Sequence, residues 1–474
     1  MGAMTMRTSR RALVSSSRLR QIVLVSVICL ALYCFLLVPD HSLDSSRPAM
    51  ADTFHHPHSS SPNSNSNPEN KQSPLSPALL NNRFLTSTQC QTHFPGLTQE
   101  IDAAVSKGPF TLRRNPHGLG PTVLRIRDGR LSILTYARKV DLSEAMLQHR
   151  SATLHQLANA LLTAPPAEPP LPDTILAFNH QDDPTSPSLS YSRPADPSFD
   201  GPTKHFFAIP HFSFFAWPIS SVRSFPRAAE SIAALESRFA SWRSKDPRAI
   251  WRGTTWFNSP RGGGGGRLRH DLVLLARGKP WADVEPLAAN GSNALMIEDF
   301  CRYRYIVHTE GVTYSGRFQY HQLCASVVLA PPISWMQHVT HLARPVFSYQ
   351  LEGVERAALD SSRKLVPYPA PWVKDAWPKE YDPREANIVF VAPDWSDLET
   401  TVEWLERHPK IAEGIARRQR ELFDGGGYFS PAAEMCYWRA LLRGWSEVVR
   451  TEGQGFENLE EIPWEEFSLK EIHK

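Results

Sequence analysis

Short apolar runs alternate with amphipathic stretches over residues 174–449, and this alternation predicts an α/β fold. The runs that predict buried strands are Thr174–Phe178, Ile250–Trp251, Tyr305–His308, Ser326–Ala330 and Asn387–Ala392. The stretches that predict helices are Arg227–Trp242, Leu398–Glu406, Pro409–Phe423 and Pro431–Val449, with a break at Gly425–Gly427. Strands that alternate with helices form parallel sheets, whose ligands bind at the carboxyl ends of the strands. Ser396 stands three residues before Glu399, and this capping-box pattern predicts the start of the helix over Leu398–Glu406.

The N-terminal part holds an apolar run over Ile22–Val38 that contains neither a charged residue nor a proline. A helix of this length spans about 25 Å, the short end of what crosses a membrane. Arginines precede the run, and Asp40 and Asp44 come after it, so the positive-inside rule places residues 1–21 in the cytosol. We predict a single-pass transmembrane signal anchor in a Golgi or ER membrane, with a cleaved signal peptide as the alternative.

Composition distinguishes the segment after the apolar run from the rest of the chain. Residues 39–85 are rich in Ser, Pro and Asn and predict a disordered stem. The rest of the 474 residues has ordinary globular composition, with 41% hydrophobic and 21% charged residues overall. The net charge of +3 is carried by arginines near the N-terminus, so the charge gives no reason to expect nucleic-acid binding.

Four cysteines lie beyond the predicted anchor, at positions 90, 301, 324 and 436. An even number in a secretory context predicts two disulfides, for which three pairings are possible. Their wide spacing is unlike that of a zinc site. Asn290 opens an Asn-Gly-Ser sequence and is a predicted glycosylation site.

Three polar segments offer side chains for proton transfer and for binding an anion. Asp182 and Asp183 come soon after the predicted strand Thr174–Phe178, where a carboxylate can act as a general base. Arg252, Gly253 and Thr255 come after the strand at Ile250–Trp251, and Arg267 and Arg269 lie downstream. Ser315 and Arg317 come after a further strand and a glycine. Arginine forks and backbone N–H groups bind phosphate oxygens at such positions, although each segment alone is more typical of an ordinary polar turn or surface loop.

Taken together, these segments resemble glycosyltransferase family 90, the family of fungal capsule-associated proteins and animal protein O-glucosyltransferases. The resemblance covers roughly Cys90–Val449. It rests on the order of NHQDDP at 179–184, PHFSFFAWP at 210–218, WRGTT at 251–255, RYRYIVHTEGVTYSGRFQYHQLCASVVL at 302–329, VAPDWSDLE at 391–399 and CYW at 436–438.

The resemblance implies a GT-B-like fold, with two Rossmann-like lobes facing across a cleft. It implies inverting transfer from a UDP-sugar without an obligatory metal or other cofactor. The family's base falls on Asp182, with Asp183 as runner-up because the family often has an aromatic residue there. The donor-binding positions fall on Arg252, Gly253, Thr255, Ser315 and Arg317, and on Arg269 or, across the glycine-rich insertion, Arg267. The family's disulfide falls on Cys301 and Cys324, which leaves Cys90 with Cys436.

These expectations divide the chain into a cytosolic tail, an anchor, a stem, an N-terminal lobe at 86–245 that holds the base, a C-terminal nucleotide-sugar lobe at 246–430, and C-terminal helices at 431–474. The predicted function is transfer of glucose or xylose from a UDP-sugar to a glycan, glycolipid or protein in the secretory pathway. The alternatives are an inactive luminal carbohydrate-binding protein and a glycosidase, which needs two carboxylates across a sugar site.

Overall fold

The structure is a computed structural model. It describes residues 74–115, 120–199, 204–259, 266–357 and 364–472. Apart from the short segment Ala288–Asn293, the described residues belong to one compact unit. That unit contains two six-stranded sheets, which we call the first and the second sheet.

The first sheet is mixed and has the strand order β18-β3-β2-β4-β5-β7. Its strands are β2 (Thr122–Arg127), β3 (Arg130–Thr135), β4 (Thr174–Phe178), β5 (Ser188–Ser190), β7 (Phe206–Ala208) and β18 (Ile462–Pro463). A tight turn at Asp128-Gly129, where both residues have positive φ, joins β2 to β3 as an antiparallel hairpin. β4 is antiparallel to β2 but parallel to β5, so the sheet changes direction at β4.

The second sheet is wholly parallel and has the strand order β11-β10-β12-β13-β16-β15. Its strands are β10 (Asp246–Gly253), β11 (Ala282–Pro286), β12 (Tyr303–Val307), β13 (Val327–Ala330), β15 (Pro345–Phe347) and β16 (Ile388–Phe390). Neighbouring residues of its central strands, such as Ile306 and Val307 or Val328 and Leu329, are fully buried. Both faces of these strands are therefore covered, which explains why they read as continuous apolar runs.

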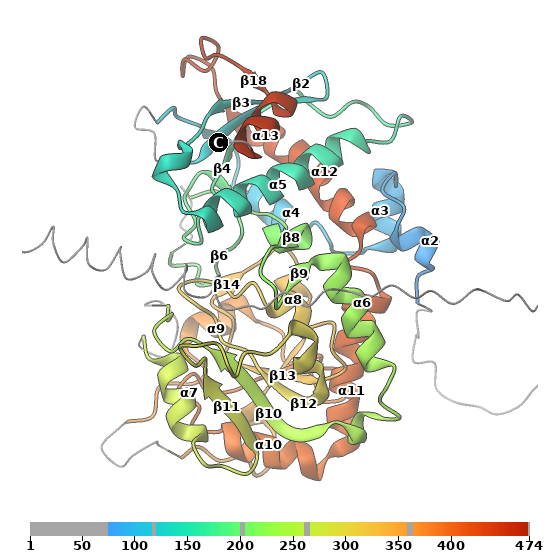
Figure 1. The fold of residues 1–474 in the computed structure, drawn as a ribbon, viewed down its shortest axis with the longest axis vertical. Coiled ribbons are helices and arrows are strands. Elements are labelled where there is room, and N and C mark those ends of the chain that lie inside the picture. The colour runs from blue at the N-terminus through green and yellow to red at the C-terminus, as the bar shows by residue number, and fades with distance from the viewer. Residues whose placement is uncertain (1–73, 116–119, 200–203, 260–265, 358–363, 473–474) are drawn as a thin grey trace, which may run out of the picture. The chain divides into compact units, whose positions relative to one another are not determined.

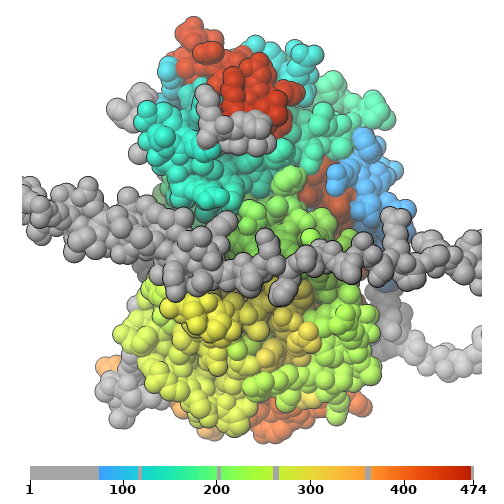
Figure 2. Space-filling view, in the orientation of Figure 1, coloured from blue at the N-terminus to red at the C-terminus, as the bar shows by residue number. Residues whose placement is uncertain are grey.

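Helices pack against the second sheet (Figure 1). They are α7 (Leu268–Ala276), α10 (Leu398–Arg407) and α11 (Pro409–Arg420), and a π-helical turn at Glu421–Gly425 extends the last of them. α6 (Phe225–Glu236) contacts the 3₁₀ helix Ile297–Arg302, and the green and yellow regions that hold them share one face of the molecule in Figure 2.

The first sheet is covered by segments from both ends of the described chain. The helices there are α3 (Ser87–His93), α4 (Gln99–Val105), α5 (Glu144–Leu162), α12 (Pro431–Val448) and α13 (Trp464–Ile472). α12 contacts α4 and α5, and the indole N–H of Trp438 donates to the side-chain oxygen of Gln156 at 3.3 Å. The shorter elements are α2 (Pro77–Leu80), β1 (Phe110–Thr111), β6 (Arg193–Pro194), β8 (Ala216–Trp217), β9 (Arg223–Ser224), α8 (Phe318–His321), β14 (Trp335–Met336), α9 (Pro371–Ala376) and β17 (Val449–Arg450).

Two disulfides join the four cysteines in the pairing that the family resemblance implies. One links Cys90 on α3 to Cys436 on α12, and the other links Cys301 to Cys324. The first closes a sequence separation of 346 residues and the second one of 23. A cross-link over a separation as long as the first removes more entropy from the unfolded chain than a short one.

The predicted fold class needs correction in two respects. Within the described ranges, no helix is both long and apolar enough to cross a membrane, and the predicted span at residues 22–38 lies outside those ranges. The transmembrane helix in the predicted fold class is therefore not supported. The first sheet is also not Rossmann-like, because three of its five strand pairings, β18–β3, β3–β2 and β2–β4, are antiparallel. The fold that the structure supports is α/β with two sheets.

The predicted start of α10 at Leu398 is confirmed, but one predicted cap and one predicted helix end are wrong. The predicted capping box at Ser396 does not form, because the N-cap residue of α10 is Asp397 and the Ser396 hydroxyl donates to Asp394 at 2.6 Å. The helix expected over Arg227–Trp242 runs from Phe225 to Glu236, and the carboxylate of Glu236 accepts a hydrogen bond from Lys245 Nζ at 2.7 Å.

Candidate functional site

A cavity of about 410 Å³ brings together most of the residues that the sequence singles out. Those that line it are Asp182, Arg252, Gly253, Arg269, Ser315 and Arg317. Asp183, Thr255 and Arg267 do not line it. A larger hollow of about 600 Å³ beside Trp281 contains none of these residues, so we place the candidate site in the smaller cavity.

The carboxyl ends of strands deliver these side chains. Asp182 lies in the turn after β4, and Arg252 and Gly253 are the last residues of β10. Ser315 and Arg317 lie in the loop between β12 and the single-turn helix α8. Arg269 comes from the first turn of α7. The site therefore lies where open α/β sheets bind ligands.

Arg269 and Arg317 are cations that have no acidic partner among the described residues. Arg269 is buried, with 7% of its surface exposed, and its guanidinium donates to the carbonyls of Glu310 at 3.0 Å and Thr254 at 3.2 Å. Arg317 is half-buried and donates to the carbonyl of Arg252 at 2.6 Å. Burial lowers the pKa of Arg269 to about 9, helped by the neighbouring charge of Arg317, and lowers that of Arg317 to about 10. Two desolvated positive charges at one cavity favour an anionic ligand.

Arg252 is arranged differently from the other two arginines. Its guanidinium forms an ion pair with Asp283 at 2.6 Å and also donates to the Asp283 carbonyl at 2.7 Å. The charge of Arg252 is thus balanced within the second sheet, while its carbonyl oxygen holds Arg317. Arg252 contributes to the cavity by fixing another arginine rather than by offering an unopposed charge.

Asp182 is held by two consecutive residues of the loop after β12. The Tyr314 hydroxyl donates to Oδ1 of Asp182 at 3.2 Å, and the Thr313 hydroxyl donates to its carbonyl at 3.1 Å. Asp182 keeps exposed surface at the cavity, but the surrounding protein removes much of its hydration. This desolvation raises the pKa of Asp182, the hydrogen bond from Tyr314 opposes the rise, and the charge of Asp183 adds to it. A carboxylate with a raised pKa suits a general base.

Uncharged imidazole and aromatic rings form another wall of the cavity, which includes His149, His211, Phe212 and Trp217. Burial lowers the pKa of His149 to about 4 and that of His211 well below its usual value. The Ser213 N–H donates to Nδ1 of His211 at 3.2 Å, so the proton of this neutral ring belongs on Nε2. One wall of the cavity therefore carries charged side chains, and another carries uncharged imidazole and aromatic rings.

Two glycines allow the backbone to approach side chains closely at this site. A Cβ atom at Gly253 would lie 2.8 Å from the Trp251 ring. A Cβ atom at Gly316 would lie 2.8 Å from Cε1 of His211 and 2.9 Å from the Trp217 ring. Both distances are far below ordinary van der Waals contact, so any larger residue would displace the end of β10 that carries Arg252, or the loop that carries Arg317, or the rings beside them.

Several residues of the site are not predicted from the sequence. Tyr314 and His211 lie in two of the segments that carry the family resemblance, at 302–329 and 210–218. The sequence assigns no role to either residue. Glu310 is buried and accepts hydrogen bonds from the N–H groups of Ser334 and Trp335, and this burial raises its pKa to about 7. His211 stands in a largely apolar segment, which is a signal that could have found it, whereas Glu310 and Tyr314 stand among other polar residues that give no such signal.

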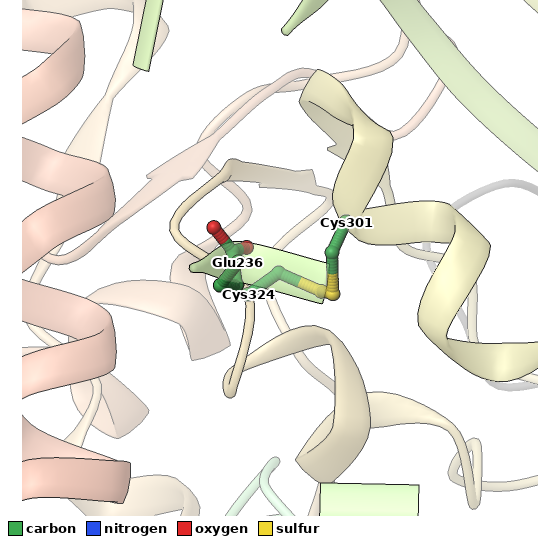
Figure 3. A group of neighbouring side chains, drawn as sticks. All are labelled: Glu236, Cys301 and Cys324. Atoms are coloured by element: carbon green, nitrogen blue, oxygen red, sulfur yellow. A yellow bond between two sulfur atoms is a disulfide. The ribbon is translucent and has the colours of Figure 1, made fainter. Parts of the chain in front are cut away.

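One group of three possible metal ligands occurs in the described part of the chain, formed by Glu236, Cys301 and Cys324. Figure 3 shows the two sulfur atoms joined to each other. A metal ion needs thiolates, which a disulfide does not offer. This group therefore does not fit a metal ion. Asn290 is exposed in the segment Ala288–Asn293, and its glycosylation stays a prediction.

Comparison with known proteins identifies the family. The profile of Glycosyl transferase family 90 matches residues 113–362, just over half of the chain, and this range contains every charged residue of the cavity. The chain belongs to glycosyl transferase family 90. This confirms the family and the enzyme class that the sequence predicts, a glycosyltransferase.

Family 90 relatives share modest identity with the chain. An O-glucosyltransferase rumi homolog from Anopheles gambiae is 25% identical over 44% of this chain and 44% of its own length. Protein O-glucosyltransferase 1 from Mus musculus is 23% identical over 59% of this chain and 64% of its own length, and the Homo sapiens protein of that name gives the same values. The chain thus spans less than two thirds of the length of these curated relatives.

Proposed function

We propose that this family 90 chain transfers a hexose or pentose, such as glucose or xylose, from a UDP-sugar to a hydroxyl group, with inversion at the anomeric carbon. The observation that carries the proposal is that a carboxylate, Asp182, and two guanidinium groups without acidic partners among the described residues, Arg269 and Arg317, line one cavity. The guanidinium groups suit the diphosphate of the donor, and the carboxylate suits the hydroxyl of the acceptor.

The proposed reaction is a single displacement. The acceptor oxygen forms a bond to the anomeric carbon while the bond from that carbon to the phosphate oxygen breaks. Asp182 takes the proton that the acceptor hydroxyl loses, and UDP leaves with the electron pair of the broken bond. Arg269 and Arg317 stabilise the negative charge that grows on the departing diphosphate. No protein atom becomes covalently attached to the sugar, so the configuration at the anomeric carbon inverts.

The names of the relatives support a protein hydroxyl as the acceptor. These proteins are called O-glucosyltransferases or protein O-glucosyltransferases. Glycan and glycolipid hydroxyls remain within the proposal because the chemistry at Asp182 is the same for all three. The two disulfides support a site of action in the oxidising secretory pathway.

The lining of the cavity argues against a glycosidase. Hydrolysis of a glycosidic bond uses two carboxyl groups that flank the sugar. Among the described residues that line the cavity, Asp182 is the single acid. The neighbouring Asp183 does not line the cavity, and its carbonyl accepts from the side chain of Asn179 at 2.7 Å.

The test is to incubate the purified protein with each UDP-sugar and a panel of protein, glycan and glycolipid acceptors, and to measure UDP release. We expect Asp182→Asn to retain UDP affinity but to lose about 10²–10⁴-fold in turnover, because the general base is absent. Asp183→Asn is the matched control and should keep most of the activity. Full turnover by the Asp182 variant would remove that residue from the role of base.

A further inference from the structure

We propose that Tyr314 is a positioning residue for Asp182: its hydroxyl holds one carboxylate oxygen, leaves the other for the acceptor proton, and connects the base to the loop that carries Ser315 and Arg317. This inference rests on the proposed function, because it assigns a role relative to the proposed base. Neither the family resemblance nor the names of the relatives assigns a role to Tyr314.

The ring of Tyr314 is fixed on several sides. It is 8% exposed, and it packs edge-on against Tyr191 at 6.1 Å and His211 at 5.1 Å between ring centroids. The phenol therefore has little freedom to turn away from Asp182, whose Oδ1 accepts its hydrogen bond at 3.2 Å. The hydroxyl of the preceding residue, Thr313, holds the carbonyl of Asp182 at 3.1 Å. Backbone and side chain of the base are thus both fixed from one loop.

That same loop carries Arg317 and is contacted by Arg269 from α7. The Gly311 N–H donates to the carbonyls of Thr313 at 2.9 Å and Tyr314 at 3.2 Å, which closes a tight turn. Arg269 donates to the Glu310 carbonyl at the start of this turn, and Arg317 comes shortly after its end. A donor diphosphate bound to these arginines would therefore act on the turn that places the Tyr314 hydroxyl. Donor binding and orientation of the base become mechanically linked.

The electrostatic surroundings make the role of Tyr314 measurable. Desolvation raises the pKa of Asp182, and the nearby Asp183 raises it further, whereas the Tyr314 hydrogen bond lowers it. The other titratable groups nearby are Tyr191, which burial keeps protonated, and His149, His180 and His211, whose pKa values are lowered by burial. Arg150 also faces His180 and lowers its pKa. The histidines are neutral and Tyr191 is protonated in the working range of pH, so none of them titrates there. Loss of the Tyr314 hydroxyl should therefore appear as a rise in the pKa of Asp182.

The experiment compares Tyr314→Phe with Tyr191→Phe in the full-length protein, each removing one phenol oxygen from touching rings. The Tyr191 hydroxyl contacts the hydroxyl of Thr153 at 2.8 Å instead of Asp182. For Tyr314→Phe we expect kcat to fall about tenfold, the acidic limb of the pH–kcat profile to move to higher pH, and KM for the UDP-sugar to change less than about twofold. Tyr191→Phe should leave the acidic limb where it is.

An acidic limb that stays in place in Tyr314→Phe, while Asp182→Asn is inactive, would overturn the positioning role and leave the proposed function intact. Full activity of Asp182→Asn would instead overturn the proposed function. If the phenylalanine variant does not fold, 3-fluorotyrosine at residue 314 preserves the shape of the ring. Its more acidic phenol donates more strongly, so the acidic limb should move to lower pH. An unmoved limb in that protein would equally refute the role.

Discussion

Replacing Arg269 or Arg317 by methionine should separate ligand binding from stability. Both guanidinium groups are desolvated at the cavity and neither has an acidic partner among the described residues. Methionine keeps much of the length of the side chain without its charge. We therefore expect each substitution to weaken UDP binding without unfolding the protein.

The structure gives the size of both effects. A charge-assisted hydrogen bond to a phosphate oxygen contributes about 1.5–3 kcal/mol, so the Kd for UDP should rise about 10- to 150-fold for each arginine removed. In the free protein, the lowering of the Arg269 pKa from 12.5 to about 9 corresponds to roughly 5 kcal/mol that opposes the charged side chain. Its two hydrogen bonds to carbonyls contribute about 1–1.5 kcal/mol each. Arg269→Met should thus raise the free energy of unfolding by about 2 kcal/mol.

The pH dependence has a definite sign. The lowered pKa of Arg269 makes the charged folded state less stable at every pH below about 9, and this penalty declines as the pH rises above that value. The gain in stability of Arg269→Met should therefore be largest at neutral pH and smaller at pH 10.

The assay is calorimetric titration with UDP, combined with urea unfolding in the presence and absence of UDP. Arg248→Met is the matched control, because Arg248 is paired with Asp246 at 2.7 Å and does not line the cavity. The control should bind UDP as the unchanged protein does. Unaltered UDP affinity in both Arg269→Met and Arg317→Met would refute the assignment of an anion site. A loss of stability in Arg269→Met would refute the reasoning on desolvation.

Three further predictions concern neighbouring features. Burial raises the pKa of Glu310 from 4.5 to about 7, so the free energy of unfolding falls as the pH rises through this range. In Glu310→Gln, the difference between the free energies of unfolding at pH 4.5 and at pH 8, measured by urea titration, should be smaller by roughly 3 kcal/mol. Gly316→Ala would place a Cβ atom 2.8 Å from His211, so UDP affinity by calorimetry should fall at least tenfold, whereas an equal affinity would show that the loop yields freely. Replacing Cys301 and Cys324 together by serine should lower the free energy of unfolding by about 3 kcal/mol in urea titrations, and a change below 1 kcal/mol would contradict the entropy argument.

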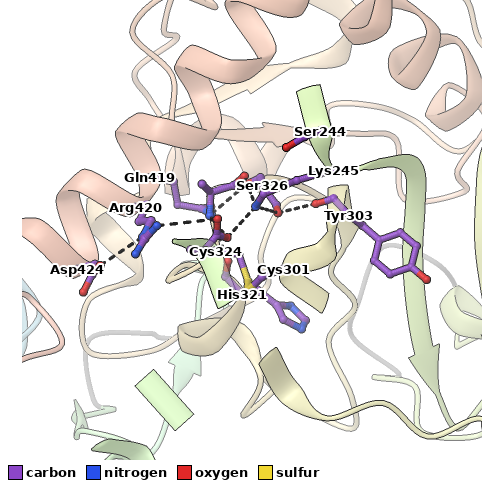
Figure 4. A network of polar contacts seen from close by, with 12 residues as sticks. Ser244, Lys245, Cys301, Tyr303, His321, Cys324, Ser326, Gln419, Arg420 and Asp424 are labelled. Carbon is purple, nitrogen blue, oxygen red and sulfur yellow. Dashed lines mark hydrogen bonds and ion pairs between the residues drawn. A yellow bond between two sulfur atoms is a disulfide. The ribbon is translucent and has the colours of Figure 1, made fainter. Parts of the chain in front are cut away.

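The polar contacts around the Cys301–Cys324 disulfide indicate which part of the fold its removal would destabilise (Figure 4). Lys245 Nζ donates to Glu236 and to the Ala325 carbonyl, both at 2.7 Å, and burial lowers the pKa of Lys245 to about 8. The Ser326 hydroxyl donates to the Tyr303 carbonyl at 2.6 Å. The disulfide thus lies beside a buried ion pair that joins α6 to the starts of β10 and β13, so its loss should loosen the second sheet first.

The sequence predicts the second sheet better than the first because of how each is buried. β10, β12, β13 and β16 are parallel and covered on both faces, so they appear as apolar runs in the sequence itself. The hairpin of β2 and β3 is not predicted. Arg125 in β2 is buried and forms an ion pair with Glu461, a partner 336 residues away that no local pattern reveals.

α5 shows the same limit for helices. It buries Arg150, Thr153 and Gln156, which interrupt the apolar period that identifies a helix. Arg150 donates to the Ala137 carbonyl at 2.7 Å and Gln156 to the His211 carbonyl at 2.9 Å, so these two side chains have hydrogen-bond partners outside the helix that no local pattern reveals.

The candidate site shows a similar division. Asp182, Arg252 and Arg317 stand at or after strand ends and are recognisable as polar residues after apolar runs. The contact between Tyr314 and Asp182 joins residues 132 positions apart, and the pairing of Arg252 with Asp283 depends on β11 lying beside β10. Sequence thus identifies which residues carry charge at the site, while the sheet determines which of those charges stay unopposed.

The long-range cross-link between Cys90 and Cys436 has a consequence for biosynthesis. β18, which completes the edge of the first sheet, and α12, which carries Cys436, both come from the last portion of the polypeptide. The first sheet therefore cannot be completed until synthesis has passed Ile462 and Pro463. Because Cys301 and Cys324 are synthesised before Cys436, any disulfide that Cys90 forms with either of them would have to be exchanged to reach the native pairing.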